Sequence, residues 1–246
     1  MTGIIEMVNV SFAVKNRLVV QDFSCRFEEG KTTALLGPSG CGKSTVLKLA
    51  AGILVPNEGL VTYRGKDIFN MTRQENLDFR RESSMVFQDS ALWANQSLYQ
   101  NLELPLIIHF PEMSPADRGK RIKEVLGKVG YKRNLSIRPA QLSMGEQKLI
   151  AFARAIICRP NLLFLDEWLE SLDDSAGQRL IHLVQLHQKE NNTVILICHN
   201  FRIARYLADF IVMIKEGRHY LNISREQIDN DESLAQYIEK GLQDEI

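Results

Sequence analysis

The stretch that decides the fold is Gly37-Pro38-Ser39-Gly40-Cys41-Gly42-Lys43-Ser44. An apolar, β-rich run at residues 31–36 precedes it, and a short segment of helical spacing, residues 44–51, follows it. Glycines let such a loop curl so that its N–H groups point at phosphate oxygens, and the helix N-terminus adds a favourable dipole. The lysine brings a point charge to phosphates, and the serine hydroxyl is a ligand for Mg²⁺. The stretch matches the pattern G-x-x-x-x-G-K-[ST] in full and predicts a nucleotide-phosphate site in an α/β protein.

The composition is that of an ordinary globular chain. With 246 residues, 45% of them hydrophobic, the chain can bury a core without disulfide staples and is unlike disordered or collagen sequences. The 30 basic and 30 acidic side chains cancel, which argues against a nucleic-acid-binding protein. No apolar run approaches the roughly 18–20 residues of a membrane-spanning helix, and residues 1–6 do not resemble a signal peptide. We therefore expect a cytoplasmic protein whose cysteines stay reduced.

Apolar runs of strand length alternate with segments of helical periodicity. We expect strands at residues 4–10, 18–27, 31–36, 59–65, 85–87, 162–165, 194–198 and 210–214. Residues 90–160 look mostly helical, with Ser114-Pro115 as a helix start that is followed by an acid at Asp117. This order predicts a parallel sheet covered by helices, into which a helical segment is inserted. Residues 217–246 are polar and partly helical, and we expect a solvated appendage there.

A second motif ends an apolar strand with two carboxylates. Residues 162–165 are Leu-Leu-Phe-Leu, and Asp166 and Glu167 follow them. Ligands of open α/β sheets bind at the carboxyl ends of the strands, so both acids belong near the phosphate loop. We expect Asp166 to face a Mg²⁺ ion and Glu167 to orient or deprotonate an attacking water.

A third motif, Leu142-Ser143-Met144-Gly145-Glu146-Gln147, opens a helix that we expect to run to about residue 157. With it the sequence resembles the ATP-binding subunits of ABC transporters, whose signature reads Leu-Ser-Gly-Gly-Gln. The other short motifs of that family follow the phosphate loop in the family's order: Gln88 (the Q-loop), the signature, Asp166-Glu167, Ser171-Leu172-Asp173 (the D-loop) and His199 (the switch histidine). The resemblance covers roughly residues 4–217.

The resemblance implies a particular α/β fold. This is a P-loop NTPase (RecA-like) core with an antiparallel β subdomain and an inserted α-helical subdomain. The whole chain, residues 1–246, would then be a single ABC ATPase domain. Within it, residues 1–89 and 160–217 form the nucleotide-binding core, residues 90–159 the helical subdomain with the signature, and residues 218–246 a C-terminal extension.

The resemblance also implies roles for individual residues around ATP and Mg²⁺. The residues implied to bind the nucleotide are Val14, Gly37, Pro38, Ser39, Gly40, Cys41, Gly42, Lys43, Ser44, Thr45, Ser143, Gly145 and Glu146. Those implied to hold the metal are Ser44, Gln88 and Asp166. The implied catalytic residues are Glu167, His199 and Gln88. Hydrolysis then proceeds by in-line attack of water on the γ-phosphate.

The family's mechanism needs a second copy of the chain. Two subunits face each other head to tail, so that Ser143 and its helix N-terminus cap the γ-phosphate of ATP on the other subunit's phosphate loop. Hydrolysis opens this sandwich and drives a transmembrane permease. The resemblance thus implies a homodimer on the cytoplasmic face of the inner membrane, with the permease docked near residues 88–106 and no nucleic acid as partner. Trp93 and Tyr99 in that segment are either docking anchors or subdomain packing.

The sequence departs from the family pattern at several positions. Met144 replaces a glycine, so its side chain restricts the backbone and would crowd the other subunit's nucleotide. Glu146 replaces a glutamine and adds a negative charge near phosphates. Both changes bear on ATP-driven dimerisation rather than on ATP binding. Trp168 replaces a proline, with packing against the D-loop as the simplest account. The family's adenine-stacking aromatic aligns with Val14, while Phe12, on the same strand face, is assigned to the core.

Weaker similarities indicate the kind of transporter. Pro105-Leu106 followed by His109, and the tail segment 236–241, are similar to the Mce-associated, Mla-type phospholipid transport ATPases. Lipoprotein-releasing and macrolide-exporting ATPases share much of residues 101–106, and a non-transport ATPase of the cell-division type is a further alternative. Chromosome ATPases of the same superfamily carry a long coiled coil, for which this helical segment is too short. Phospholipid transport, together with lipid-binding partner proteins, is the function we carry forward.

Overall fold

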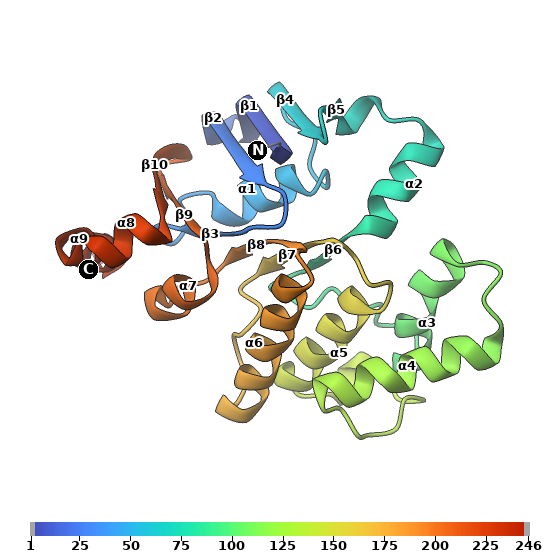
Figure 1. Ribbon diagram of the computed structural model, residues 1–246. Coiled ribbons are helices and arrows are strands. Elements are labelled where there is room, and N and C mark those ends of the chain that lie inside the picture. The colour runs from blue at the N-terminus through green and yellow to red at the C-terminus, as the bar shows by residue number, and fades with distance from the viewer. Residues whose placement is uncertain (1–2, 244–246) are drawn as a thin grey trace.

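The computed structural model describes residues 3–243 (Figure 1). Its strands are β1 (Gly3–Val14), β2 (Arg17–Glu28), β3 (Thr32–Leu36), β4 (Glu58–Tyr63), β5 (Lys66–Asp67), β6 (Ser83–Val86), β7 (Leu162–Asp166), β8 (Thr193–Ile197), β9 (Phe210–Lys215) and β10 (Arg218–Ser224). Its α-helices are α1 (Lys43–Ala50), α2 (Arg73–Glu82), α3 (Leu98–His109), α4 (Pro115–Val129), α5 (Met144–Ile156), α6 (Asp174–Lys189), α7 (Phe201–Leu207), α8 (Arg225–Asn230) and α9 (Glu232–Gln243). Among residues 3–243, no helix is both long enough and apolar enough to cross a membrane. Each expected strand is confirmed to within a few residues, whereas β5 and β10 were not expected.

A six-stranded sheet forms the centre of the molecule, in the order β10-β9-β3-β8-β7-β6. Only β10 and β9 pair antiparallel; the other neighbours in this sheet are parallel. Every residue of β3, β7 and β8 is buried, as expected for apolar strands covered on both faces. Leu163 and Leu165 pack in the core that holds α3–α7, while Leu162 and Phe164 pack in the core that holds α1. The predicted parallel sheet between layers of helices is therefore confirmed.

A second, antiparallel sheet has the order β2-β1-β4-β5. In Figure 1, α1 lies between this sheet and the central one. One core cluster holds Val46 and Leu47 of α1, Val10 and Phe23 of the antiparallel sheet, and Ile195 of the central sheet. Because α1 is covered from both sides, the phosphate loop is anchored by a buried strand at one end and a buried helix at the other.

Helices α3, α4 and α5 pack on the opposite face of the central sheet from α1. Helix α4 begins where the sequence predicts, since the Ser114 hydroxyl accepts a hydrogen bond from the Asp117 N–H at 3.1 Å. Its core-facing residues are Ile122, Val125, Leu126 and Val129. Residues 90–97 are not helical, so the helical segment begins later than expected. The proposed subdomain boundaries at residues 90, 160 and 218 stay predictions.

The C-terminal residues pack onto the rest of the molecule, which corrects the expectation of a solvated appendage. Strand β10 pairs with β9 and extends the central sheet. Four apolar residues of this segment are buried in the core that α3–α7 share: Ile223, Ile228, Ala235 and Ile238. They are spread over β10, α8 and α9 among many polar residues, and on α9 the buried Ala235 and Ile238 are three residues apart and share one helix face. Residues 1, 2 and 244–246 of the predicted domain lie outside the described residues.

Candidate active site

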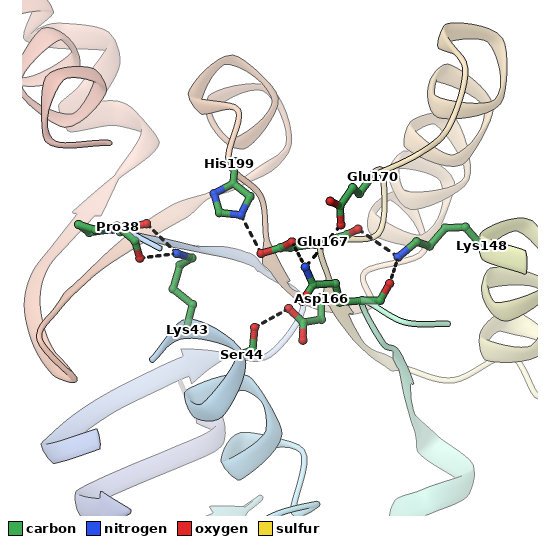
Figure 2. Close-up of polar contacts among 10 residues, drawn as sticks. Pro38, Lys43, Ser44, Lys148, Asp166, Glu167, Glu170 and His199 are labelled. Atoms are coloured by element: carbon green, nitrogen blue, oxygen red, sulfur yellow. Dashed lines mark hydrogen bonds and ion pairs between the residues drawn. The ribbon is translucent and has the colours of Figure 1, made fainter. Parts of the chain in front are cut away.

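The predicted catalytic segments meet at one edge of the central sheet (Figure 2). The phosphate loop follows β3, Gln88 comes after β6, Asp166 ends β7 with Glu167 next to it, and His199 comes after β8. These strands are parallel, so their carboxyl ends share one edge, where such sheets bind ligands. A pocket of about 300 Å³ at this edge is lined by Val19, Ser39, Gly40, Gly42, Lys43, Ser44, Thr45, Gln88 and Glu167.

Backbone geometry shapes the phosphate loop. Gly37 has φ +149°, and a Cβ there would lie 2.2 Å from the Ile214 carbonyl oxygen, so only glycine fits. Gly42 caps α1 from the left-handed region, at φ +104°. Lys43 is buried, and its ammonium donates to the carbonyl oxygens of Gly37 and Pro38, both at 2.7 Å. Since these acceptors carry no net charge, they leave the positive charge of Lys43 uncancelled, which suits a polyphosphate.

Ser44 and Asp166 form the part of the site that can hold a metal. The Ser44 hydroxyl donates to Asp166 Oδ1 at 2.9 Å. Burial raises the pKa of the Asp166 carboxyl above its ordinary value, although the hydrogen bond from Ser44 acts in the opposite direction. A hydroxyl and a carboxylate are oxygen ligands that Mg²⁺ prefers, and a divalent cation offsets the cost of burying the charge. The two side chains therefore fit a magnesium site.

Glu167 lies at the centre of a hydrogen-bond network. Its Oε2 accepts from the Gln88 amide at 2.5 Å, and its Oε1 lies 2.7 Å from His199 Nε2. Glu167 has φ +44°, a left-handed conformation that is uncommon for a residue with a side chain. Its side chain is 14% exposed, so it is shielded from bulk solvent but remains reachable. The structure thus brings the three predicted catalytic residues into direct contact.

A larger cavity leads from the loop toward the turn between β1 and β2. Its volume is about 1020 Å³, and half-exposed Val14 lines it together with Ser39, Gly40 and Cys41. Phe12 packs instead against the core that holds α1. The cavity is large enough for a nucleoside, with Val14 as an apolar wall.

The signature residues cap helix α5. Ser143 Oγ accepts from the Glu146 N–H at 3.2 Å, and Glu146 Oε2 accepts from the Ser143 N–H at 2.9 Å, which makes a reciprocal capping box. Arg133 donates to both carboxylate oxygens of Glu146, at 2.8 and 2.9 Å, and lowers the pKa of Glu146. The negative charge that the sequence places near phosphates is therefore compensated within the chain by Arg133.

Met144 and Gly145 have different surroundings. A Cβ at Gly145 would lie 2.7 Å from the Ser171 carbonyl oxygen, so the close approach of the D-loop requires glycine there. Met144 is 70% exposed in the first turn of α5. Neither residue lines the two cavities beside the phosphate loop. Met144 is therefore exposed, whereas Gly145 is partly covered by the D-loop of the same chain.

We expect Met144→Gly to strengthen ATP-dependent dimerisation about tenfold, which corresponds to about 1.4 kcal/mol. The substitution removes an exposed side chain where the resemblance places the other subunit's nucleotide, and glycine permits a closer backbone approach to phosphate. Sedimentation velocity with ATP, on a Glu167→Gln background, measures the effect. Val55→Gly removes another exposed apolar side chain and serves as the control, which should behave as the parent. A dimer no stronger than the parent would show that Met144 does not face that nucleotide.

Trp168 is wholly buried and packs against the signature helix. Its ring centroid lies 5.8 Å from that of Phe152 in α5. Its indole Nε1 has no hydrogen-bond partner among residues 3–243, so apolar burial accounts for this side chain. Because Trp168 directly follows Glu167, it anchors the backbone of the catalytic segment to α5. The sequence predicted that Trp168 packs against the D-loop, and it gave no sign of the contact with Phe152.

Sequence reasoning missed Lys148, which lies on α5 and is buried. Its ammonium donates to the carbonyl oxygens of Gln88, at 2.5 Å, and Glu167, at 3.3 Å. A signal was present in the sequence, since Lys148 shares a helix face with Ala151 and Phe152, three and four residues further on. A lysine is rarely buried without a specific partner, so a lysine on an apolar helix face indicates such a contact.

The chain is similar to known proteins in sequence and in structure. The profile of the family described as "ABC transporter" matches residues 20–170. The chain is 30% identical over 239 residues to the intermembrane phospholipid transport system ATP-binding protein MlaF of Haemophilus influenzae, covering 94% of this chain and 88% of MlaF. It is 31% identical over 210 residues to the cell division ATP-binding protein FtsE of Escherichia coli K12, covering 85% of this chain and 94% of FtsE. A solved dimer of the ATP-binding cassette MJ0796 with ADP and phosphate has a TM-score of 0.82 at 27% identity, covering 90% of this chain and 98% of that one.

The chain belongs to the ABC transporter family, and it is an ATPase of that family. The match of the structures confirms the expected α/β fold with its P-loop NTPase core. The matched residues 20–170 include the phosphate loop, Gln88, the signature and the Asp166-Glu167 pair, whereas His199 and the C-terminal helices lie beyond them.

Proposed function

We propose that this ATPase hydrolyses ATP with Mg²⁺ at the edge of the central sheet and thereby powers a membrane transporter. The observation that carries the proposal is the place of Glu167. Its carboxylate contacts Gln88 and His199 and lines the same pocket as Lys43 and Ser44. A base, its positioning partners and a phosphate-binding cation are thus side by side.

The first task is to bind the nucleotide. Lys43 and the loop N–H groups of residues 37–45 bind the phosphates, and Val14 contacts the adenine. Ser44, Asp166 and Gln88 hold Mg²⁺, which neutralises phosphate charge when it is bound. The buried Ser44–Asp166 pair supports this assignment.

The second task is to prepare the attacking water. Glu167 accepts its proton, because it is a carboxylate with access to the pocket. Gln88 donates a hydrogen bond to one oxygen of that carboxylate, and His199 Nε2 lies within hydrogen-bond distance of the other oxygen. They therefore orient the base toward the γ-phosphate side of the pocket.

Each active site is completed by a second copy of the chain. The solved relative MJ0796 is a dimer, and the signature of this chain lies outside its own nucleotide cavities. Ser143, Gly145 and Glu146 would therefore contact ATP held by the other subunit. We propose a homodimer in which residues 1–89 and 160–217 form the core, residues 90–159 the helical subdomain and residues 218–246 the extension.

A groove between α2, α3 and the segment after Gln88 is the proposed permease site. Its volume is about 360 Å³, and its lining includes Arg80, Arg81, Trp93, His109 and Arg154. Trp93 is 45% exposed, while Tyr99 packs against the core, which favours Trp93 as the docking anchor. Docking there places the dimer on the cytoplasmic face of the inner membrane.

Phospholipid is the cargo we propose, with lipid-binding proteins in the same complex. Similarity to MlaF over 94% of this chain supports it. A comparable similarity to FtsE supports the second candidate, a cell-division type of ATPase that moves no cargo. ATPases of lipoprotein release and efflux remain alternatives for the transported molecule.

A pull-down from native membranes tests the proposal. Tagged Glu167→Gln protein is extracted in mild detergent, and co-purifying proteins and lipids are identified by mass spectrometry. A multispanning permease with a lipid-binding partner and phospholipid is the expected result. Trp93→Ala should reduce recovery of the permease, whereas Tyr206→Ala, which removes an exposed aromatic outside the groove, should not. Recovery of a lipoprotein-release or efflux permease would keep the transport function but contradict phospholipid as the cargo. Recovery of soluble partners alone would contradict the transport function.

A further inference from the structure

Lys148 is a buried cation that touches both catalytic segments. Its side chain lies on α5 and is 3% exposed. The ammonium donates to the carbonyl oxygens of Gln88 at 2.5 Å, Glu167 at 3.3 Å and, more weakly, Phe87 at 3.5 Å. Two of these acceptors belong to residues whose side chains meet in the active site.

The buried environment of Lys148 disfavours its positive charge. Burial lowers the pKa of Lys148, even though the carboxylates of Glu170, Asp166, Glu167 and Asp89 act to raise it. Within the described part of the chain, no ion pair partners the ammonium, which is held by carbonyl oxygens alone. A buried charge of this kind adds little net stability, because desolvation opposes its contacts. The contribution of Lys148 therefore lies in the backbone segments that its ammonium positions.

What Lys148 holds is the backbone on either side of the catalytic hydrogen bond. Gln88 Nε2 and Glu167 Oε2 are 2.5 Å apart, and one ammonium binds the carbonyl oxygens of the same two residues. Glu167 has φ +44°, a conformation that needs support from its surroundings. In Figure 2, Lys148 and His199 lie on opposite sides of Glu167, so backbone and carboxylate are fixed from two directions.

Lys148 also connects this site to the signature. Ser143 caps α5 five residues before Lys148, little more than one helical turn away. A rigid-body shift of α5 would therefore move Ser143 and Lys148 together.

We propose that Lys148 is a positioning residue for ATP hydrolysis, whose ammonium holds the backbones of Gln88 and Glu167 at the spacing their side chains need and ties that spacing to the signature helix. The inference rests on the roles proposed above for Gln88 and Glu167.

Lys148→Met tests it, since methionine has a similar reach but neither charge nor donor. We expect kcat to fall tenfold to a hundredfold, because a misplacement of about 1 Å has an effect of this order. The KM for ATP and the Kd for ATP should stay within twofold of the parent, because Lys148 lines neither nucleotide cavity. Lys148→Gln, which keeps an uncharged donor, should recover part of kcat. Lys123→Met, at an exposed site on α4, is the matched control and should leave kcat unchanged.

A double-mutant cycle separates positioning from general destabilisation. If Lys148 acts through Glu167, adding Lys148→Met to Glu167→Gln causes little further loss of the single-turnover rate. A structural role would instead lower the rate by the same factor in both backgrounds. If Lys148→Met does not fold, the same cycle is measured with Lys148→Gln.

Three outcomes overturn the proposal. These are an unchanged kcat in Lys148→Met, a fall in kcat matched by a rise in KM and a loss of Tm, and a cycle with fully additive effects. If the roles proposed for Gln88 and Glu167 are wrong, the result is different, because the Glu167→Gln variant alone would then keep its ATP turnover.

Discussion

Glu167→Gln is expected to lower kcat for ATP hydrolysis about a thousandfold while ATP binding is kept, since loss of a positioned general base has an effect of this size. Glutamine has the shape of glutamate but cannot accept the proton of the attacking water. Its amide can still bond to Gln88 and His199, so the geometry around it is preserved. Phosphate release under saturating ATP, together with equilibrium ATP binding, measures both quantities.

A neighbouring carboxylate supplies the control for this prediction. Glu170 Oε2 lies 3.5 Å from Gln88 Nε2, against 2.5 Å for Glu167 Oε2. Glu170→Gln should therefore change kcat by no more than a few fold. If Glu167→Gln turns over ATP at a rate near that of the parent, or if Glu170→Gln is the inactive variant, the base has been assigned to the wrong residue.

Lys43→Ala is expected to weaken ATP binding about a hundredfold, an amount typical of losing a charge-assisted contact in a shielded site. The ammonium is buried under the loop and is held by two neutral carbonyl oxygens, so its charge is directed at whatever the loop binds. Hydrolysis at low ATP concentration should fall in parallel. Equilibrium titration with a fluorescent ATP analogue measures the affinity.

Lys31→Ala is the matched control for Lys43→Ala, because Lys31 is exposed directly before β3, at the end of that strand away from the phosphate loop. Its ATP affinity should equal that of the parent. Thermal unfolding shows whether Lys43→Ala keeps its fold, since the alanine leaves the carbonyl oxygens of Gly37 and Pro38 without this donor. An unchanged Kd in a folded Lys43→Ala variant would contradict the phosphate-binding role.

Local patterns in the sequence were enough to predict eight strands, though not β5 and β10, together with the phosphate loop and the start of α4, because each depends on neighbouring residues. A glycine-rich loop between an apolar strand and a helix has few other conformations. The capping box of Ser143 and Glu146 is also readable from its three-residue spacing. The sequence could not show that Arg133 donates hydrogen bonds to both carboxylate oxygens of Glu146 and so compensates the negative charge of Glu146.

By itself the sequence determined the class of protein and the order of its motifs, and it predicted which residues bind phosphate and metal. The tertiary structure decided which of them meet. Glu167 contacts Gln88 across 79 residues and His199 across 32, and Ser44 contacts Asp166 across 122. The same holds for Lys148, for Trp168, which packs against α5, and for the apolar residues that the C-terminal segment adds to the core. Such contacts depend on how parallel strands and their covering helices pack, and packing joins residues that no local periodicity relates.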